Sequence, residues 1–290
     1  MKRQQAGFTL VELIMVIVIV GVMASTLVVF FKPAFDSYLA VGRRAGLTDL
    51  ADTAMRKMTR DVRLAVPNSI RLATSKCFEL VPTSTGGRYR GAPDTVWDAA
   101  NPGNPSKAMD MSVAIPVFDV VTSLTSTPVA GDWVVIDNQN TNDVYTGSNR
   151  AAILSVDTPP PATTGVHRIT LSAAKQFPIG YDGGRFTIVP NAQQAVFYVC
   201  DSPGLDANGD GTGKVYRFAS YGFSAASPSA CPSPVSTTPI LVSSVESCAF
   251  VYDPNHGATQ QSGFVEIQLK ITQRNESVSL VYGAHVDNVP

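Results

Sequence analysis

The sequence predicts an α+β fold in which one long N-terminal helix precedes a β-rich globular head. A short basic leader is followed by an apolar run from Phe8 to Phe31, and apolar residues at helical spacing continue almost to Pro67. Beyond this proline, apolar residues alternate with polar ones, which is the spacing of strands. The helix is therefore expected over residues 8–66 and the head over residues 67–290.

The apolar run is long enough to cross a membrane. A helix over residues 8–31 would be roughly 36 Å long at ~1.5 Å per residue, against a hydrocarbon core of about 30 Å. Glu12 is the only charge in this run, and a carboxylate near the bilayer centre costs about 2.5–3.5 kcal/mol on insertion scales. Such an acid indicates a function. If the chain were cut after Gly7, the new α-amino group of Phe8 could pair with it.

The second half of the expected helix lies under the head. Pro33 should kink the helix, because proline removes one backbone hydrogen bond and clashes with the preceding turn. Lys57 and Asp61 are four residues apart and are expected to pair on the face opposite the apolar stripe. The stripe consists of Leu39, Leu50, Ala54, Met58, Val62 and Ala65.

The strand prediction for the head comes from alternating segments bounded by turn residues. The last two segments alternate best, and Arg274-Asn275 between them reads as a tight hairpin turn in which asparagine takes a positive φ. Long proline-rich breaks separate other segments, so a division of the head into two lobes stays open. The predicted strands are Ser69–Ala73, Phe78–Val81, Trp133–Asp137, Ala152–Val156, Arg168–Ser172, Arg185–Val189, Ala195–Cys200, Lys214–Ser220, Ala249–Tyr252, Gly263–Thr272 and Ser277–Val286.

A short motif at the start of the chain is the most specific signal. Residues 7–13 read GFTLVEL and follow a leader that carries Lys2 and Arg3. This pattern resembles the class III signal of type IV prepilins and of type II secretion pseudopilins. An ordinary secretory signal would need a small-residue cleavage site after the apolar run, and residues 22–26 are a poor candidate. A plain signal anchor is the alternative interpretation.

The resemblance implies a type IV pilin-like fold and a set of functional residues. Residues 1–7 would be a leader peptide, which a prepilin peptidase removes between Gly7 and Phe8 before it methylates the Phe8 amine. Glu12 would pair with the Phe8 amine of a neighbouring subunit and set the axial register. The expected partners are this peptidase and methylase, other major and minor pilins packed through the N-terminal helix, and the inner-membrane assembly platform.

The resemblance also implies a location. The protein would be a single-pass protein of the bacterial inner membrane with a periplasmic head. After assembly it would lie in a pilus on the cell surface.

The four cysteines all lie beyond the apolar run. In an oxidising periplasm an even number favours two disulfides, for which three connectivities are possible. We favour Cys77–Cys200 together with Cys231–Cys248, although the spacing does not decide among the three.

One segment resembles the first half of a calcium loop. Asp206, Asn208 and Asp210 supply oxygen ligands at alternate positions and a glycine follows. The glutamate that would complete the loop is replaced by Arg217, so an acid from elsewhere would be needed. A plain hairpin turn is the alternative.

Composition and motifs argue against nucleic-acid binding and catalysis. A net charge of −1 gives no bulk basic field, and no basic stripe marks the head. No metalloprotease motif, nucleophile elbow, phosphate loop or dinucleotide fingerprint occurs. Residues 86–90 read GGRYR, for which an exposed basic loop is a simpler interpretation than an anion-binding turn. We expect a non-enzymatic protein with no cofactor other than a possible structural calcium. The scattered histidines are His167, His256 and His285.

Further segments resemble one branch of the pilin family. Residues 45–71, 77–82, 87–90, 196–200 and 285–290 are similar to the large minor pilins of mannose-sensitive haemagglutinin pili. This resemblance implies a low-abundance subunit that starts or caps a pilus and supports surface attachment. Two alternatives are a large, J-like minor pseudopilin of type II secretion and a tip adhesin whose head binds a glycan. A DNA-uptake pilin is disfavoured because a basic stripe is lacking.

Overall fold

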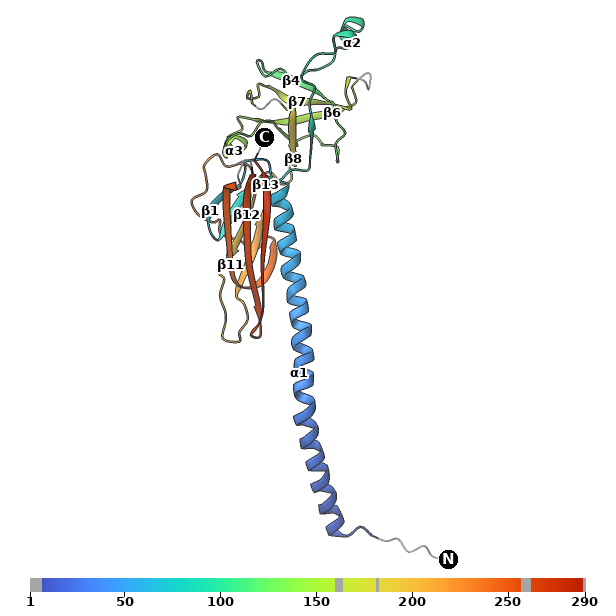
Figure 1. Ribbon diagram of the computed structural model, residues 1–290, viewed down its shortest axis with the longest axis vertical. Coiled ribbons are helices and arrows are strands. Elements are labelled where there is room, and N and C mark those ends of the chain that lie inside the picture. Colours follow the sequence, from blue (N-terminus) through green and yellow to red (C-terminus); the bar gives the residue numbers. More distant parts are fainter. Residues whose placement is uncertain (1–6, 160–163, 181–182, 257–261, 289–290) are drawn as a thin grey trace, which may run out of the picture.

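The structure, a computed structural model, describes residues 7–159, 164–180, 183–256 and 262–288. One long helix, α1, carries two antiparallel sheets at its C-terminal end, and its N-terminal half projects away from them (Figure 1). The expected α+β fold, a long N-terminal helix followed by a β-rich head, is confirmed.

Helix α1 (Leu10–Arg63) is unbroken over 54 residues. Pro33 lies inside it, so the expected kink does not interrupt the helix, and the ribbon curves only gently (Figure 1). The helix ends before the predicted Val66. The reason is that the backbone N–H of Val66 donates to the carbonyl of Val81 at 2.8 Å, and Ala65 forms an isolated antiparallel bridge with Pro82.

The seven-stranded sheet packs on the C-terminal half of α1. Its order is β1-β2-β9-β10-β11-β12-β13, with antiparallel neighbours throughout. Helix residues from Leu47 to Val62 share one core with the inner face of the sheet. The β12–β13 turn is tight as predicted, because Arg274 and Asn275 have φ of +49° and +62°. The strands are β1 (Arg71–Thr74), β2 (Cys77–Leu80), β9 (Val196–Asp201), β10 (Gly213–Phe218), β11 (Ile240–His256), β12 (Ser262–Gln273) and β13 (Glu276–Asp287).

The six-stranded sheet forms a second lobe. All its strands lie between β2 and β9 in the sequence, so the lobe is one insertion into the first sheet. It has its own apolar core around Phe118 and Ile188. Figure 1 places it beyond the C-terminal end of α1, far from the start of that helix. Its order is β3-β8-β5-β6-β7-β4. The elements are β3 (Thr85–Arg88), α2 (Thr95–Ala100), β4 (Ile115–Val120), β5 (Trp133–Val135), α3 (Asp143–Thr146), β6 (Arg150–Asp157), β7 (His167–Lys175) and β8 (Arg185–Val189).

Two strands of this lobe, β3 and β4, were not predicted from the sequence. Strand β3 contains Gly86 and Gly87, and glycine is depleted in strands. Here close packing requires them: a Cβ on Gly87 would lie 2.6 Å from Thr122 Oγ1, and one on Gly86 2.9 Å from the Phe186 carbonyl oxygen. Strand β4 contains Pro116, which it tolerates because β4 lies at the edge of the sheet.

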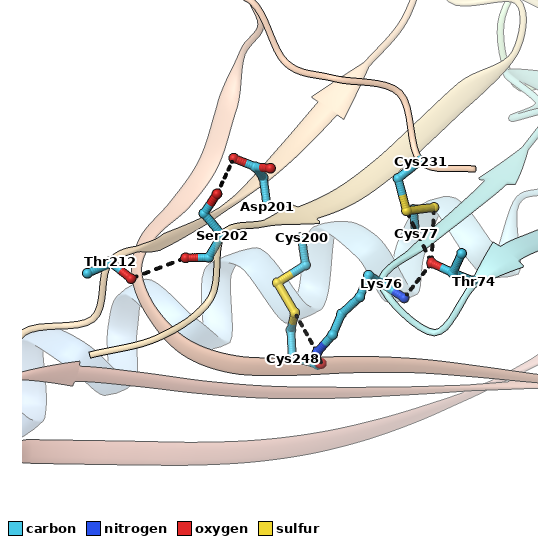
Figure 2. The surroundings of a disulfide bond; sticks show 9 residues. All are labelled: Thr74, Lys76, Cys77, Cys200, Asp201, Ser202, Thr212, Cys231 and Cys248. Atoms are coloured by element: carbon cyan, nitrogen blue, oxygen red, sulfur yellow. Dashed lines mark hydrogen bonds between the residues drawn. A yellow bond between two sulfur atoms is a disulfide. The ribbon is translucent and has the colours of Figure 1, made fainter. Parts of the chain in front are cut away.

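Two disulfides join the four cysteines, but the predicted pairing was wrong. Cys77 bonds Cys231, and Cys200 bonds Cys248 (Figure 2). Cys77 packs beside Val199 on the outer face of the sheet, whereas Cys200 belongs to the core shared with α1. Because successive residues of a strand point to opposite faces, Cys77 and Cys200 face opposite sides of the sheet. They therefore have different partners.

Asp61 ties α1 to the sheet. It forms the predicted ion pair with Lys57, at 2.8 Å. The prediction that it lies on the exposed face was wrong, because Asp61 is only 5% exposed. Its Oδ2 accepts hydrogen bonds from the Tyr198 hydroxyl at 2.6 Å and from Arg217 Nη2 at 2.9 Å. One helix residue is thus a shared acceptor for β9 and β10.

We expect Asp61→Asn to lower the free energy of unfolding by about 2 kcal/mol at neutral pH, because charged hydrogen bonds are lost from a mostly buried site. Burial alone would raise the pKa of Asp61, but bonds from Lys57 and Tyr198 and the charge of Arg217 outweigh it and lower the pKa. A lowered folded-state pKa stabilises the protein above the unfolded-state pKa of about 3.9, and this stabilisation is lost as the pH falls below that value. Urea unfolding of the full chain in detergent micelles should show a difference between variant and parent that narrows towards about pH 2. Asp49→Asn, at an exposed position on α1, should have little effect at either pH. Equal losses for Asp61→Asn at both pH values would contradict this assignment.

A buried ion pair lies where the two lobes meet. Arg71 of β1 and Glu79 of β2 are 4% and 1% exposed, and Arg71 Nη2 donates to Glu79 Oε2 at 2.6 Å. Arg71 Nε donates to the same oxygen at 2.9 Å, and the hydroxyl of Tyr221 donates to Oε1 at 2.7 Å. Burial and the charge of Glu79 raise the pKa of Tyr221, so its hydroxyl remains a donor at neutral pH. Both carboxylate oxygens are therefore bonded.

The remaining N–H groups of Arg71 bind the second lobe and a loop of the first. Nη1 donates to Asn142 Oδ1 next to α3 at 3.1 Å and to the carbonyl of Ala226 at 3.3 Å. Nη2 also donates to the carbonyl of Ser224 at 3.0 Å. The guanidinium carbon lies 3.4 Å from the ring centroid of Tyr145 in α3. One side chain therefore joins β1, α3 and the β10–β11 loop.

Candidate assembly site at the N-terminus

The motif residues stand at the start of α1. Phe8 is 80% exposed, and Thr9 is the N-cap of the helix. The carboxylate of Glu12 accepts hydrogen bonds from the backbone N–H and the hydroxyl of Thr9, both at 3.0 Å, and Thr9 Oγ1 accepts from the Glu12 N–H at 3.3 Å. This reciprocal capping box satisfies two of the N–H groups that a helix start leaves without partners.

The capping box places the charge of Glu12 at the end of the helix where Phe8 is attached. A carboxylate there interacts favourably with the positive end of the helix dipole. If cleavage after Gly7 created an amine on Phe8, that amine would lie at the same end. In the uncut chain, Thr9 supplies the partners for Glu12.

Thr9 is a site residue that the sequence analysis missed. The spacing T-x-x-E ahead of an apolar run is the capping-box signal. Glu12 therefore has a local role in starting the helix, in addition to any role between subunits.

The N-terminal half of α1 packs against no other part of the chain among the residues that the structure describes. Residues 7–39 are exposed, and they include the apolar side chains on every side of the helix. By length and composition α1 is able to cross a membrane. A helix that is apolar all round is stable only in lipid or against other protein surfaces. The segment therefore requires a membrane or neighbouring subunits.

The hydrogen bonds of the candidate calcium loop do not favour a metal site. Asp206 Oδ1 accepts from the backbone N–H of Asn208 at 2.9 Å and of Asp210 at 2.8 Å. Asp210 Oδ1 accepts from the backbone N–H of Arg274 at 2.6 Å. Among the residues that the structure describes, no three His, Cys, Asp or Glu side chains form a group able to hold a metal. The loop closes as a tight turn docked on the β12–β13 hairpin, and calcium binding stays a prediction.

The histidines are dispersed over the head. His167 begins β7 in the second lobe, whereas His256 ends β11 and His285 lies on β13 in the first sheet. Their positions give no support to a shared catalytic or metal site.

Comparison with known protein families identifies the N-terminal segment. Residues 2–28 match the family model described as the prokaryotic N-terminal methylation motif. No curated protein and no solved structure matches the chain. With the long apolar helix and the antiparallel β-rich head, the match gives the chain a type IV pilin-like α+β fold.

Proposed function

We propose that this protein, whose first residues carry a prokaryotic N-terminal methylation motif, is a minor type IV pilin. The motif supports a pilin or pseudopilin role. The observation that carries the proposal is that the motif begins a helix whose first half is apolar on all sides and exposed along its length. Such a helix suits a subunit that is anchored in a membrane and then moves into the core of a filament.

The proposed mechanism uses four residues at the start of the chain. A prepilin peptidase cuts between Gly7 and Phe8 and methylates the new amine. During assembly Glu12 of the incoming subunit leaves its bond to Thr9 and pairs with the Phe8 amine of a neighbour. The two charges then offset the cost of burying each other in the apolar filament core.

The finer proposal is a subunit of the mannose-sensitive haemagglutinin type that starts or caps the pilus and supports attachment. Its support is the resemblance of several head segments, together with the position of the second lobe. That lobe lies beyond the C-terminal end of α1 (Figure 1). In a filament of parallel helices, a subunit stacked above would meet this lobe, which favours a place at the distal end.

Two other roles share the motif and are distinguished by phenotype. A J-like minor pseudopilin would be needed for type II secretion, whereas a minor pilin would be needed for surface piliation. A tip adhesin would bind a glycan through its head.

Mass spectrometry of sheared surface filaments and of washed membranes tests the proposal. We expect filaments to contain a peptide that begins with N-methylated Phe8, and we expect Gly7→Ala to accumulate as uncut precursor in the membrane. Cleaved protein confined to the membrane would favour a pseudopilin. Uncut protein with Met1 to Gly7 intact in the parent would contradict pilin processing altogether.

A further inference from the structure

A cleft lies at the junction of the two lobes. It has a volume of about 480 Å³, within the range of small-ligand sites. The first lobe contributes Pro67 and Asp287, and the second contributes Gly86, Arg88 and Arg185. Residues from the segment that follows α1, the end of β13 and the β3–β8 pair therefore surround one space.

Two arginines face this cleft side by side. Arg88 of β3 and Arg185 of β8 are direct partners in the antiparallel register, so their side chains lie on the same face of the sheet. Directly opposed side chains of like charge destabilise a strand pair. Both arginines are exposed, and neither side chain has a hydrogen-bond or ion-pair partner among the described residues. This arrangement presents two guanidinium groups to a ligand.

The same face is open between the arginines and the neighbouring strand. Gly86 pairs with Thr187 of β8, which in turn pairs with Val135 of β5. Because Gly86 has no side chain, the floor of the cleft beside the arginines stays clear, and Thr187 lines it.

The opposite charges of the cleft indicate the class of ligand. Asp137 and Asp287 line it together with the two arginines, so the four charges cancel. A neutral balance disfavours a polyanion such as nucleic acid or polyphosphate. Guanidinium groups recognise a carboxylate in a planar, two-bond geometry, and carboxylates accept hydrogen bonds from hydroxyl groups. A ligand with one carboxylate and several hydroxyl groups suits both the arginines and the aspartates of the cleft.

The walls of the cleft are held in place. Arg71 binds Glu79 of the first lobe and Asn142 of the second, and Asn68 Nδ2 donates to the carbonyl of Asn138, which lines the cleft, at 2.9 Å. These bonds fix the lobes relative to each other at this point. Fixed walls reduce the ordering cost of binding.

We infer that the interlobe cleft binds an acidic saccharide, with Arg88 and Arg185 on its carboxylate. The inference names a ligand for the adhesin role among the proposed functions and rests on that role only for its biological setting. Binding itself is a property of the purified protein, whether or not the chain enters filaments.

Titration calorimetry on the full chain in detergent micelles at low salt tests the inference. The probe is galacturonate, a sugar acid with one carboxylate and several hydroxyl groups, and its methyl ester is the matched neutral probe. We expect the acid to bind and the ester to bind at least about tenfold more weakly. Arg88→Gln and Arg185→Gln should each lower the affinity for the acid by about tenfold or more. Arg274→Gln, at the opposite end of β13 from Asp287, is the charge-matched control and should bind like the parent.

Three results would overturn the inference: no binding of the acid by the folded parent, equal binding of acid and ester, or unchanged binding by both arginine variants. Inorganic sulfate that displaces the acid at equal concentration would also overturn it, because it would indicate general anion binding. Circular dichroism checks that the variants are folded. Binding by the purified protein does not depend on pilin processing in cells. The proposed pilin role could therefore be contradicted while the saccharide site is supported, or the reverse.

Discussion

Replacing Glu12 by alanine should leave the protein in the membrane and exclude it from filaments. Without the carboxylate the apolar run inserts more easily, since a charged side chain within a membrane-spanning segment is costly. In the filament, however, the Phe8 amine of the neighbour would be buried without a partner, and an unpaired buried charge is strongly unfavourable. We expect incorporation to fall at least about tenfold, measured by immunoblots of sheared filaments against membranes.

The capping box requires two control variants. Glu12→Gln retains the ability to cap Thr9, because glutamine serves at this position, but it removes the charge. Thr9→Val removes the cap hydroxyl and keeps the charge. If pairing between subunits is what matters, Glu12→Gln should be excluded from filaments and Thr9→Val should be incorporated. The reverse result would show that the helix start, rather than the charge pair, is required.

Replacing Arg71 by methionine should lower the free energy of unfolding by about 3–5 kcal/mol. The substitution leaves the carboxylate of Glu79 buried and without its cation, and breaking a buried pair from one side costs this much. It also removes the bonds to Asn142 and to the carbonyls of Ser224 and Ala226. Denaturant unfolding of the full chain in micelles gives the energy. Hydrogen exchange should become faster in α3 and in the β10–β11 loop.

A second substitution tests whether the unpaired carboxylate of Glu79 causes the loss of stability in Arg71→Met. Adding Glu79→Gln to Arg71→Met replaces the unpaired carboxylate by a neutral amide, so the double variant should be more stable than Arg71→Met alone. If the decreases in the free energy of unfolding caused by Arg71→Met and by Glu79→Gln simply add, the unpaired charge does not cause the loss of stability. Arg71→Lys keeps the positive charge but has fewer donors, and it should speed exchange in α3 at a smaller cost in stability.

The elements best predicted from the sequence are those whose signals come from residues close together in the sequence. The long helix follows from an apolar run and a stripe at helical spacing, and every predicted strand corresponds to a strand of the structure. The β12–β13 turn follows from two residues, Arg274 and Asn275. The N-terminal motif is also contiguous, so Gly7, Phe8 and Glu12 are proposed from the sequence, and the family match covers the same segment.

Strands β3 and β4 show where local signals fail. The glycines of β3 reduce strand propensity, yet the close approach of β8 and of Thr122 requires them. The proline of β4 disfavours a strand until its place at the sheet edge is known. In both cases the decisive contact is remote in the sequence.

The sequence by itself determined the membrane-length helix, the processing motif and the β-rich character of the head, because each depends on periodicity or on adjacent residues. Only the tertiary structure decided which face of the sheet each cysteine occupies, and hence that Cys77 bonds Cys231. It also decided that Asp61 points into the core and that Arg88 and Arg185 meet at a cleft between lobes. These features depend on which strands become neighbours, and strand pairing between distant segments leaves no local pattern.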